Sequence, residues 1–234
     1  MRTACLLSLV TLLLARGVAA AEVSGHVALM SDYRYRGESL SGGRPAVQAG
    51  GSYDHPSGLF LGALASTVRT DPATSGIGAQ LYGGYAQTFG ANASWDLGFA
   101  SYLFPHPLVE PSYDYTEMFF GISCDVVSAR LYYSNDYFGG SGRALYLEVN
   151  GFRQFDERIA LIGHLGYLDL SQLRQPMAGR KGGSLSDFKA GVAIDVARFT
   201  LEFSVVGTTA QSDTCPAGTG HCNATGVISI SRSF

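Results

Sequence analysis

Charged residues recur at alternate positions in several strand-like segments, and this spacing points them to one side of a sheet. Near the N-terminus, Asp32, Arg34 and Arg36 alternate with Tyr33 and Tyr35. Fixed charges of this kind set ion selectivity when they line a pore. Acidic and basic groups on opposite sides of a pore would impose a transverse field on a small polar solute. If the same groups paired with one another, they would plug the pore as structural ion pairs. The predicted pore-lining residues are Asp32, Arg34, Arg36, Glu117, Arg130, Asp136, Glu148 and Lys189.

Catalysis is the second chemistry to consider, and it needs a nucleophile, a base and an orienting group within hydrogen-bond reach. His26 and His164 are the two histidines that fall in predicted strands. The sequence has no G-x-S-x-G nucleophile elbow, and Gly140-Ser141-Gly142 is typical of a flexible loop. A lone histidine at the middle of a strand is typical of a structural hydrogen-bond partner. We therefore predict that the protein is not an enzyme and uses no cofactor or metal.

Two cysteines near the C-terminus bracket a short loop. Cys215 and Cys222 enclose Pro216-Ala217-Gly218-Thr219-Gly220-His221. An exported protein can form a disulfide at this spacing, and a Cys215–Cys222 disulfide is the prediction. Two reduced thiols and a metal clip are the alternatives, although His221 alone does not complete a zinc site.

The N-terminus has the features of a secretory signal peptide. A short basic start, Met1-Arg2, precedes an apolar run over residues 4–15, and Val18-Ala19-Ala20-Ala21 supplies an A-x-A cleavage site. The prediction is a cleaved signal over residues 1–21 and a single domain over residues 22–234. Loss of Arg2 and Arg16 with the signal leaves a formal net charge of about −5, which argues against a nucleic-acid-binding surface.

These candidate residues would be positioned by a series of alternating segments of about ten residues, close to the length of a tilted strand that crosses a bilayer. Short turns and longer loops alternate between them. An even strand count with this loop pattern is typical of an outer-membrane β-barrel, in which closure leaves no unpaired strand edge in lipid. The predicted strands are 23–36, 46–53, 59–68, 78–89, 93–104, 113–124, 127–137, 144–154, 158–168, 186–195, 199–208 and 224–234.

A soluble β-sandwich would also alternate, with its apolar face inward. Such a sandwich would carry many lysines and glutamates outside, yet the chain after residue 21 has only Lys181 and Lys189. The sequence therefore predicts an all-β fold, a closed, transmembrane, antiparallel up-and-down barrel of about twelve strands. Aromatic residues near strand ends are expected to form interfacial girdles. They include Tyr33, Tyr35, Tyr53, Phe89, Trp95, Phe104, Tyr137, Phe138, Phe155, Tyr167 and Phe199.

Several stretches together resemble one bacterial family across the whole predicted mature chain. The most specific is Ser31-Asp32-Tyr33-Arg34-Tyr35-Arg36-Gly37, and the C-terminal Ser231-Arg232-Ser233-Phe234 is another. Further stretches are Pro45-Ala46-Val47-Gln48, Leu81-Tyr82-Gly83-Gly84-Tyr85, Asp114-Tyr115-Thr116-Glu117, Ser134-Asn135-Asp136-Tyr137-Phe138 and Tyr146-Leu147-Glu148-Val149-Asn150. They resemble the TorF-type porin family of proteobacteria, described as conserved hypothetical proteins. The resemblance implies a barrel and supplies no catalytic residues.

The expected function is a porin-like channel for passive diffusion of small polar solutes or ions, with a weak cation preference from the acidic excess. The alternative is a plugged structural barrel whose outer loops bind a ligand or a surface, as an adhesin or receptor would. We expect the outer membrane as location, with both termini periplasmic. Its partners there would be membrane lipid, lipopolysaccharide and the barrel insertion machinery.

Overall fold

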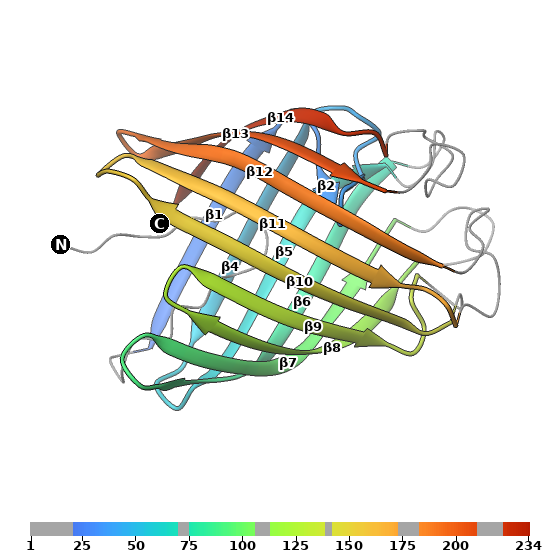
Figure 1. Ribbon diagram of the computed structural model, residues 1–234, viewed down its shortest axis with the longest axis horizontal. Helices are drawn as coiled ribbons and strands as arrows, with labels where there is room; N and C mark the ends of the chain where they lie inside the picture. The colour runs from blue at the N-terminus through green and yellow to red at the C-terminus, as the bar shows by residue number, and fades with distance from the viewer. Residues whose placement is uncertain (1–20, 70–74, 106–112, 139–141, 173–182, 210–221) are drawn as a thin grey trace.

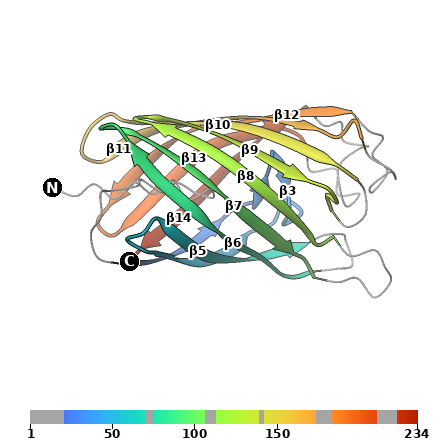
Figure 2. The same ribbon diagram turned by 90° about the horizontal axis from the view of Figure 1, so that it is seen from below.

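A computed structural model describes residues 21–69, 75–105, 113–138, 142–172, 183–209 and 222–234. Twelve antiparallel strands close into one barrel, which Figures 1 and 2 show from two directions. The predicted fold class is thereby confirmed. The predicted signal peptide falls almost entirely outside the described residues. Within the described part of the chain, no helix has the length and apolarity to cross a membrane.

The wall follows chain order, so each strand pairs with its neighbours in sequence, and β1 closes the barrel against β14. A two-stranded sheet of β2 and β3 is separate from the wall. The wall strands are β1 (Glu22–Met30), β4 (Ala46–Asp54), β5 (Leu59–Arg69), β6 (Ser75–Phe89), β7 (Ala93–Leu103), β8 (Tyr115–Cys124), β9 (Val127–Ser134), β10 (Ala144–Gln154), β11 (Ile159–Asp169), β12 (Ser184–Val196), β13 (Phe199–Thr208) and β14 (Thr225–Ser233).

Tight connections gather at one end of the barrel, which we call the short-turn end. Residues 125–126 join β8 to β9, and residues 197–198 join β12 to β13. His26 of β1 pairs with Ser233 of β14, so the start of β1 and the end of β14 also lie at the short-turn end. We call the opposite end the long-loop end.

Side chains alternate between the barrel exterior and its lumen. In β8, Met118, Phe120 and Ile122 are exposed, whereas Glu117 and Phe119 are buried. The same period of two runs through β5 and β10. Because the exposed side chains are large and apolar, the outer wall carries the hydrophobic belt of a membrane barrel. Polar side chains and one cluster of aromatic side chains are buried inside.

The first strand was predicted to run to Arg36, and this boundary is wrong. β1 ends at Met30, and the chain then turns into the lumen, where β2 (Arg34–Tyr35) pairs with β3 (Glu38–Ser39). The alternation of residues 32–36 is the same in either setting, since both are extended. Polar bonds within residues 31–45 shape the hairpin, and contacts with distant wall strands hold it in the lumen.

The predicted aromatic girdle also needs a correction. Five of its members, Tyr33, Tyr35, Phe104, Tyr137 and Phe138, belong to the buried aromatic core of the lumen or pack against it. Phe104 stacks on Phe138 with ring centroids 5.3 Å apart. These rings therefore do not belong to an outer girdle.

Candidate functional site

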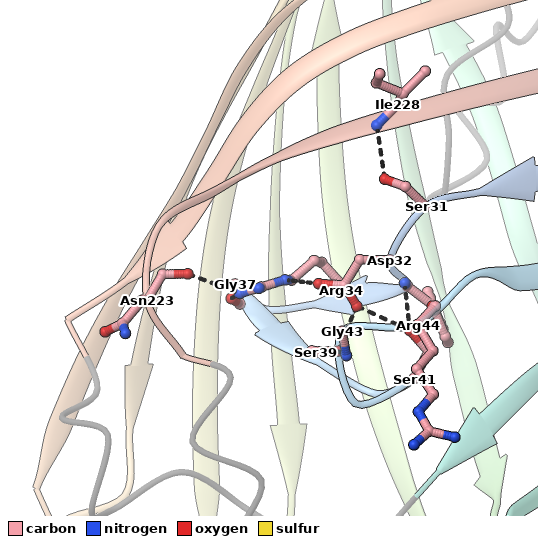
Figure 3. Close-up of polar contacts among 11 residues, drawn as sticks. Ser31, Asp32, Arg34, Gly37, Ser39, Ser41, Gly43, Arg44, Asn223 and Ile228 are labelled. Carbon is pink, nitrogen blue, oxygen red and sulfur yellow. Dashed lines mark hydrogen bonds and ion pairs between the residues drawn. The ribbon is translucent and has the colours of Figure 1, made fainter.

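Residues 31–45, which we call the lumen hairpin, are held in shape by polar contacts of Asp32 (Figure 3). Its carboxylate accepts hydrogen bonds from Ser39 and from Arg34 Nε, which lies 2.6 Å from Oδ2. Ser41 Oγ lies 2.9 Å from Asp32 Oδ1 and accepts a bond from the Tyr33 amide. Asp32 is 5% exposed. A buried carboxylate with this many donors is well satisfied, and it fixes the base of the hairpin.

The tip of the lumen hairpin is a two-residue turn made by Arg36 and Gly37. Both have positive φ, 50° and 77°, which is the geometry of a type I′ hairpin turn. Gly37 lies so close to the wall that an added Cβ would be 2.6 Å from the Gly207 carbonyl oxygen. The same Cβ would be 2.8 Å from the Cβ atoms of Asp187 and Thr208. The tip therefore rests directly against β12 and β13.

Arg36 extends from this tip to the opposite part of the wall. Its Nη2 lies 2.7 Å and 3.0 Å from the two carboxylate oxygens of Glu117 on β8. The side chains are 5% and 1% exposed. Four tyrosine rings, which we call the tyrosine cage, surround the guanidinium, with Cζ 4.0–5.5 Å from their centroids. They are Tyr35, Tyr132, Tyr137 and Tyr146.

The tyrosine cage compensates for the burial of the Arg36 charge. Burial disfavours the charged form, but Glu117 and the surrounding tyrosines outweigh it and hold the pKa of Arg36 well above its ordinary value. Among the described residues, Arg36 Nε and Nη1 have no hydrogen-bond partner. The faces of the rings attract a cation electrostatically and take the place of acceptors. Arg36 is thus permanently charged and is bound by a carboxylate and aromatic faces.

The rest of the hairpin packs on the aromatic core near the long-loop end. The hydroxyl groups of Tyr35 and Tyr115 lie 2.9 Å apart, and Tyr102 stacks on Tyr115 at 4.5 Å. The Arg69 amide donates to the Leu40 carbonyl. With its tip on β12 and β13, the hairpin contacts the wall on several sides of the lumen.

Other interior charges lie in pairs between nearby strands, either adjacent or separated by one strand. Arg130 makes two hydrogen bonds to Asp96, at 3.0 and 3.1 Å. His164 Nε2 lies 2.8 Å from Asp187 Oδ1, and its Nδ1 lies 2.7 Å from Asn150 Oδ1. His164 is therefore a hydrogen-bond partner within the lumen, as predicted. A further pair joins Lys189 Nζ to Glu202, 2.6 Å apart.

A cavity of about 140 Å³ remains beside the hairpin. Its lining combines the tip of the hairpin with polar groups from β7, β9, β10, β11 and β12. Tyr132, Tyr146 and Arg36 lie on its surface, so the cavity reaches the tyrosine cage. A concave site with convergent polar groups is suited to a small polar solute or ion.

Five of the predicted pore-lining residues line this cavity. They are Arg34, Arg36, Arg130, Glu148 and Lys189. Glu117 is buried next to it as the partner of Arg36, and Asp32 is enclosed in the base of the hairpin. Asp136 is exposed beyond the end of β9 and does not line the cavity.

Tyr132 and Tyr146 were not among the predicted pore-lining residues, although their rings face inward. Their signal was parity, since Tyr132 lies two residues after Arg130 and Tyr146 two residues before Glu148. Each must therefore point to the same side of its strand as a charge that was predicted to face the lumen. Two rings of the tyrosine cage were therefore within reach of the pattern. Tyr137 has the parity opposite to Arg130, so neither its place in the cage nor the identity of the cation could be predicted.

Cys222 is buried and disulfide-bonded. Its predicted partner, Cys215, lies outside the described residues, so the pairing stays a prediction. Cys124 is free and exposed. Within the described ranges, no group of three or more histidine, cysteine, aspartate or glutamate side chains is arranged to hold a metal ion.

Similar folds occur among solved outer-membrane porins. The chain resembles the KdgM porin with a TM-score of 0.53 and 12% identity, covering 92% of this chain and 99% of that one. It resembles the NanC porin with a TM-score of 0.53 and 10% identity, covering 91% and 99%. At these identities the likeness shows the fold alone. No curated protein matches the sequence.

The sequence itself matches one family over residues 15–234, which includes all of the barrel. The resemblance seen in the sequence was to an uncharacterised bacterial family, and this match supports a family of that kind. The chain belongs to the Gcw_chp family, described as a bacterial protein of unknown function.

Proposed function

We propose that this protein is an outer-membrane channel for passive diffusion of small polar solutes or ions. The observation that supports this best is an apolar outer belt around a lumen that keeps a charged cavity of about 140 Å³. A barrel wall of this kind needs lipid outside and tolerates water inside. The porin fold of KdgM and NanC agrees with this proposal.

The proposed setting is the bacterial outer membrane, in contact with lipid and lipopolysaccharide after delivery by the barrel insertion machinery. The short-turn end would face the periplasm, as it does in barrels of this class. Both termini would then be periplasmic, because the start of β1 and the end of β14 lie at that end.

A weak preference for cations follows from the interior charges. The interior carboxylates described above outnumber the lysine and arginine side chains, and fixed charge sets the selectivity of a narrow pore. The carboxylates are Asp32, Asp96, Glu117, Glu148, Asp187 and Glu202, and the cations are Arg34, Arg36, Arg130 and Lys189. Because most of them are paired, the net field is small.

A plugged structural barrel whose outer loops bind a ligand or a surface is the second candidate. The lumen hairpin favours it, since its tip touches β12 and β13 while Arg36 is bound to β8. An enzymatic role is not proposed. His164 is within hydrogen-bond distance of Tyr146, Asn150 and Asp187, and none of these partners is a serine or cysteine.

Single-channel conductance of the refolded protein in a planar bilayer tests the proposal. We expect small steps, and under a salt gradient a reversal potential with the sign of a cation-preferring pore. Strong anion selectivity would refute the cation preference. A folded barrel that never conducts would refute the channel and favour the plugged barrel.

A further inference from the structure

Arg36 occupies an arrangement that recognises a guanidinium group. A carboxylate binds one nitrogen of the group, and aromatic rings cover its remaining surface. This is the chemistry by which proteins bind organic cations. The cation here comes from the chain itself, at the tip of a hairpin that is not part of the barrel wall.

The receiving groups belong to other parts of the chain. Glu117 is on β8, Tyr132 on β9 and Tyr146 on β10, while Tyr137 follows β9. Only Tyr35 moves with the hairpin. If the hairpin moved away, a carboxylate and three rings would remain on the wall and at its rim.

Wall contacts hold two of these rings independently of Arg36. The Tyr132 hydroxyl donates to Glu148 Oε1 at 3.2 Å, and the Tyr146 hydroxyl donates to the Asp187 carboxylate at 3.2 Å. These two rings are therefore organised in advance, which reduces the entropic cost of binding a cation from solution. The cavity beside the cage gives a small molecule a place to arrive.

We propose that Glu117, Tyr132, Tyr137 and Tyr146 form a binding site for guanidinium-bearing solutes, and that Arg36 occupies it as an internal ligand. Such a solute would compete with Arg36 and release the tip of the lumen hairpin. This consequence for transport rests on the proposed channel function, whereas the binding site does not.

The direct test empties the site and supplies the missing group from solution. Arg36→Gly removes the side chain and keeps the turn, since glycine adopts a φ of 50° without strain. Methylguanidinium chloride is then titrated into the variant in detergent micelles by calorimetry, with sodium chloride as the ionic control. We expect saturable binding to R36G, and binding to the wild type only at much higher methylguanidinium concentrations, because the tethered arginine has the advantage of high effective concentration.

Two further variants make the test specific. R36G/E117Q should bind methylguanidinium about tenfold or more weakly than R36G, because a hydrogen bond to a charged group is lost. R158A should behave as wild type, since Arg158 is exposed in the turn between β10 and β11 at the short-turn end and leaves the cage filled. Equal binding by R36G and R36G/E117Q, or no binding by R36G, would overturn the proposal.

Folding and transport are read separately. Unheated gel migration reports folded barrel, and if R36G folds poorly its yield with and without methylguanidinium becomes the measurement. Recovery of the folded form by methylguanidinium supports the site, and no recovery contradicts it.

Conductance of the wild type with and without methylguanidinium tests the release of the hairpin. Binding without any conductance would keep the site and refute the channel.

Discussion

The contact between Gly37 and the wall predicts that a single methyl group will detach the lumen hairpin. In Gly37→Ala the new Cβ would lie 2.6 Å from the Gly207 carbonyl oxygen and 2.8 Å from the Cβ atoms of Asp187 and Thr208. These atoms belong to the backbone or are joined directly to it, so none can rotate away. The tip must withdraw from β12 and β13.

Gly42 of the same hairpin provides a matched control. Its φ is 65°, close to the 77° of Gly37, but its added Cβ would meet only the Arg69 side chain, 3.3 Å away. Each alanine costs about 1–2 kcal/mol for its left-handed backbone. Overpacking adds about 1–3 kcal/mol in Gly37→Ala alone. The detached population should therefore be about 5–150 times larger in G37A than in G42A.

Hydrogen exchange of the amides in residues 31–45 measures this population, because a detached segment exchanges in proportion to its opening equilibrium. Amides of the wall strands serve as the internal reference and should exchange alike in both variants. Equal exchange of the hairpin in G37A and G42A would refute the tight docking of the tip. It would also refute the idea that contact between the tip and β12 and β13 closes the lumen.

Three further predictions concern other parts of the barrel. Glu148→Gln should shift the reversal potential toward anions, since the Glu148 side chain lines the cavity; an unchanged potential would remove it from the ion path. Asp156 accepts hydrogen bonds from the backbone amides of Arg158 and Ile159, which lower its pKa. The stabilisation by ionised Asp156 is present above the ordinary carboxyl pKa and is lost as pH falls. The difference in melting temperature between wild type and D156A should therefore narrow from pH 7 to pH 3. A difference that stays constant would contradict this. Mass spectrometry of unreduced peptides should find Cys222 linked to Cys215, and a link to another cysteine would refute the pairing.

The alternation of apolar and polar residues made the barrel predictable. On β8, Glu117 and Met118 were assigned to opposite faces, and the structure agrees. When side chains alternate between apolar and polar along a strand, only one of its two faces can be the apolar one. The alternation of short turns and long loops then limits the topology. The strand count and most of the faces therefore needed no knowledge of tertiary contacts. In residues 59–68 both parities are apolar, and the inward face was left open.

The lumen hairpin was predictable only in part. Gly37 and the Gly42-Gly43 pair were visible as turn formers, but they were assigned to an outer loop. Asp32, Arg34 and Arg36 keep the same alternation in a wall strand or in a hairpin, since both are extended chain. Local sequence could not distinguish the two, because the deciding contacts lie elsewhere in the barrel.

Local periodicity was enough to predict a closed barrel, its strand order and the side of the wall on which most charges lie. The tertiary structure alone decided that Arg36 meets Glu117, 81 residues away, inside a cage of tyrosines. Burial makes that pairing strong, because a charge removed from water must find its partner in the fold. No pattern along the chain specifies which carboxylate and which rings will surround Arg36 once the barrel has closed.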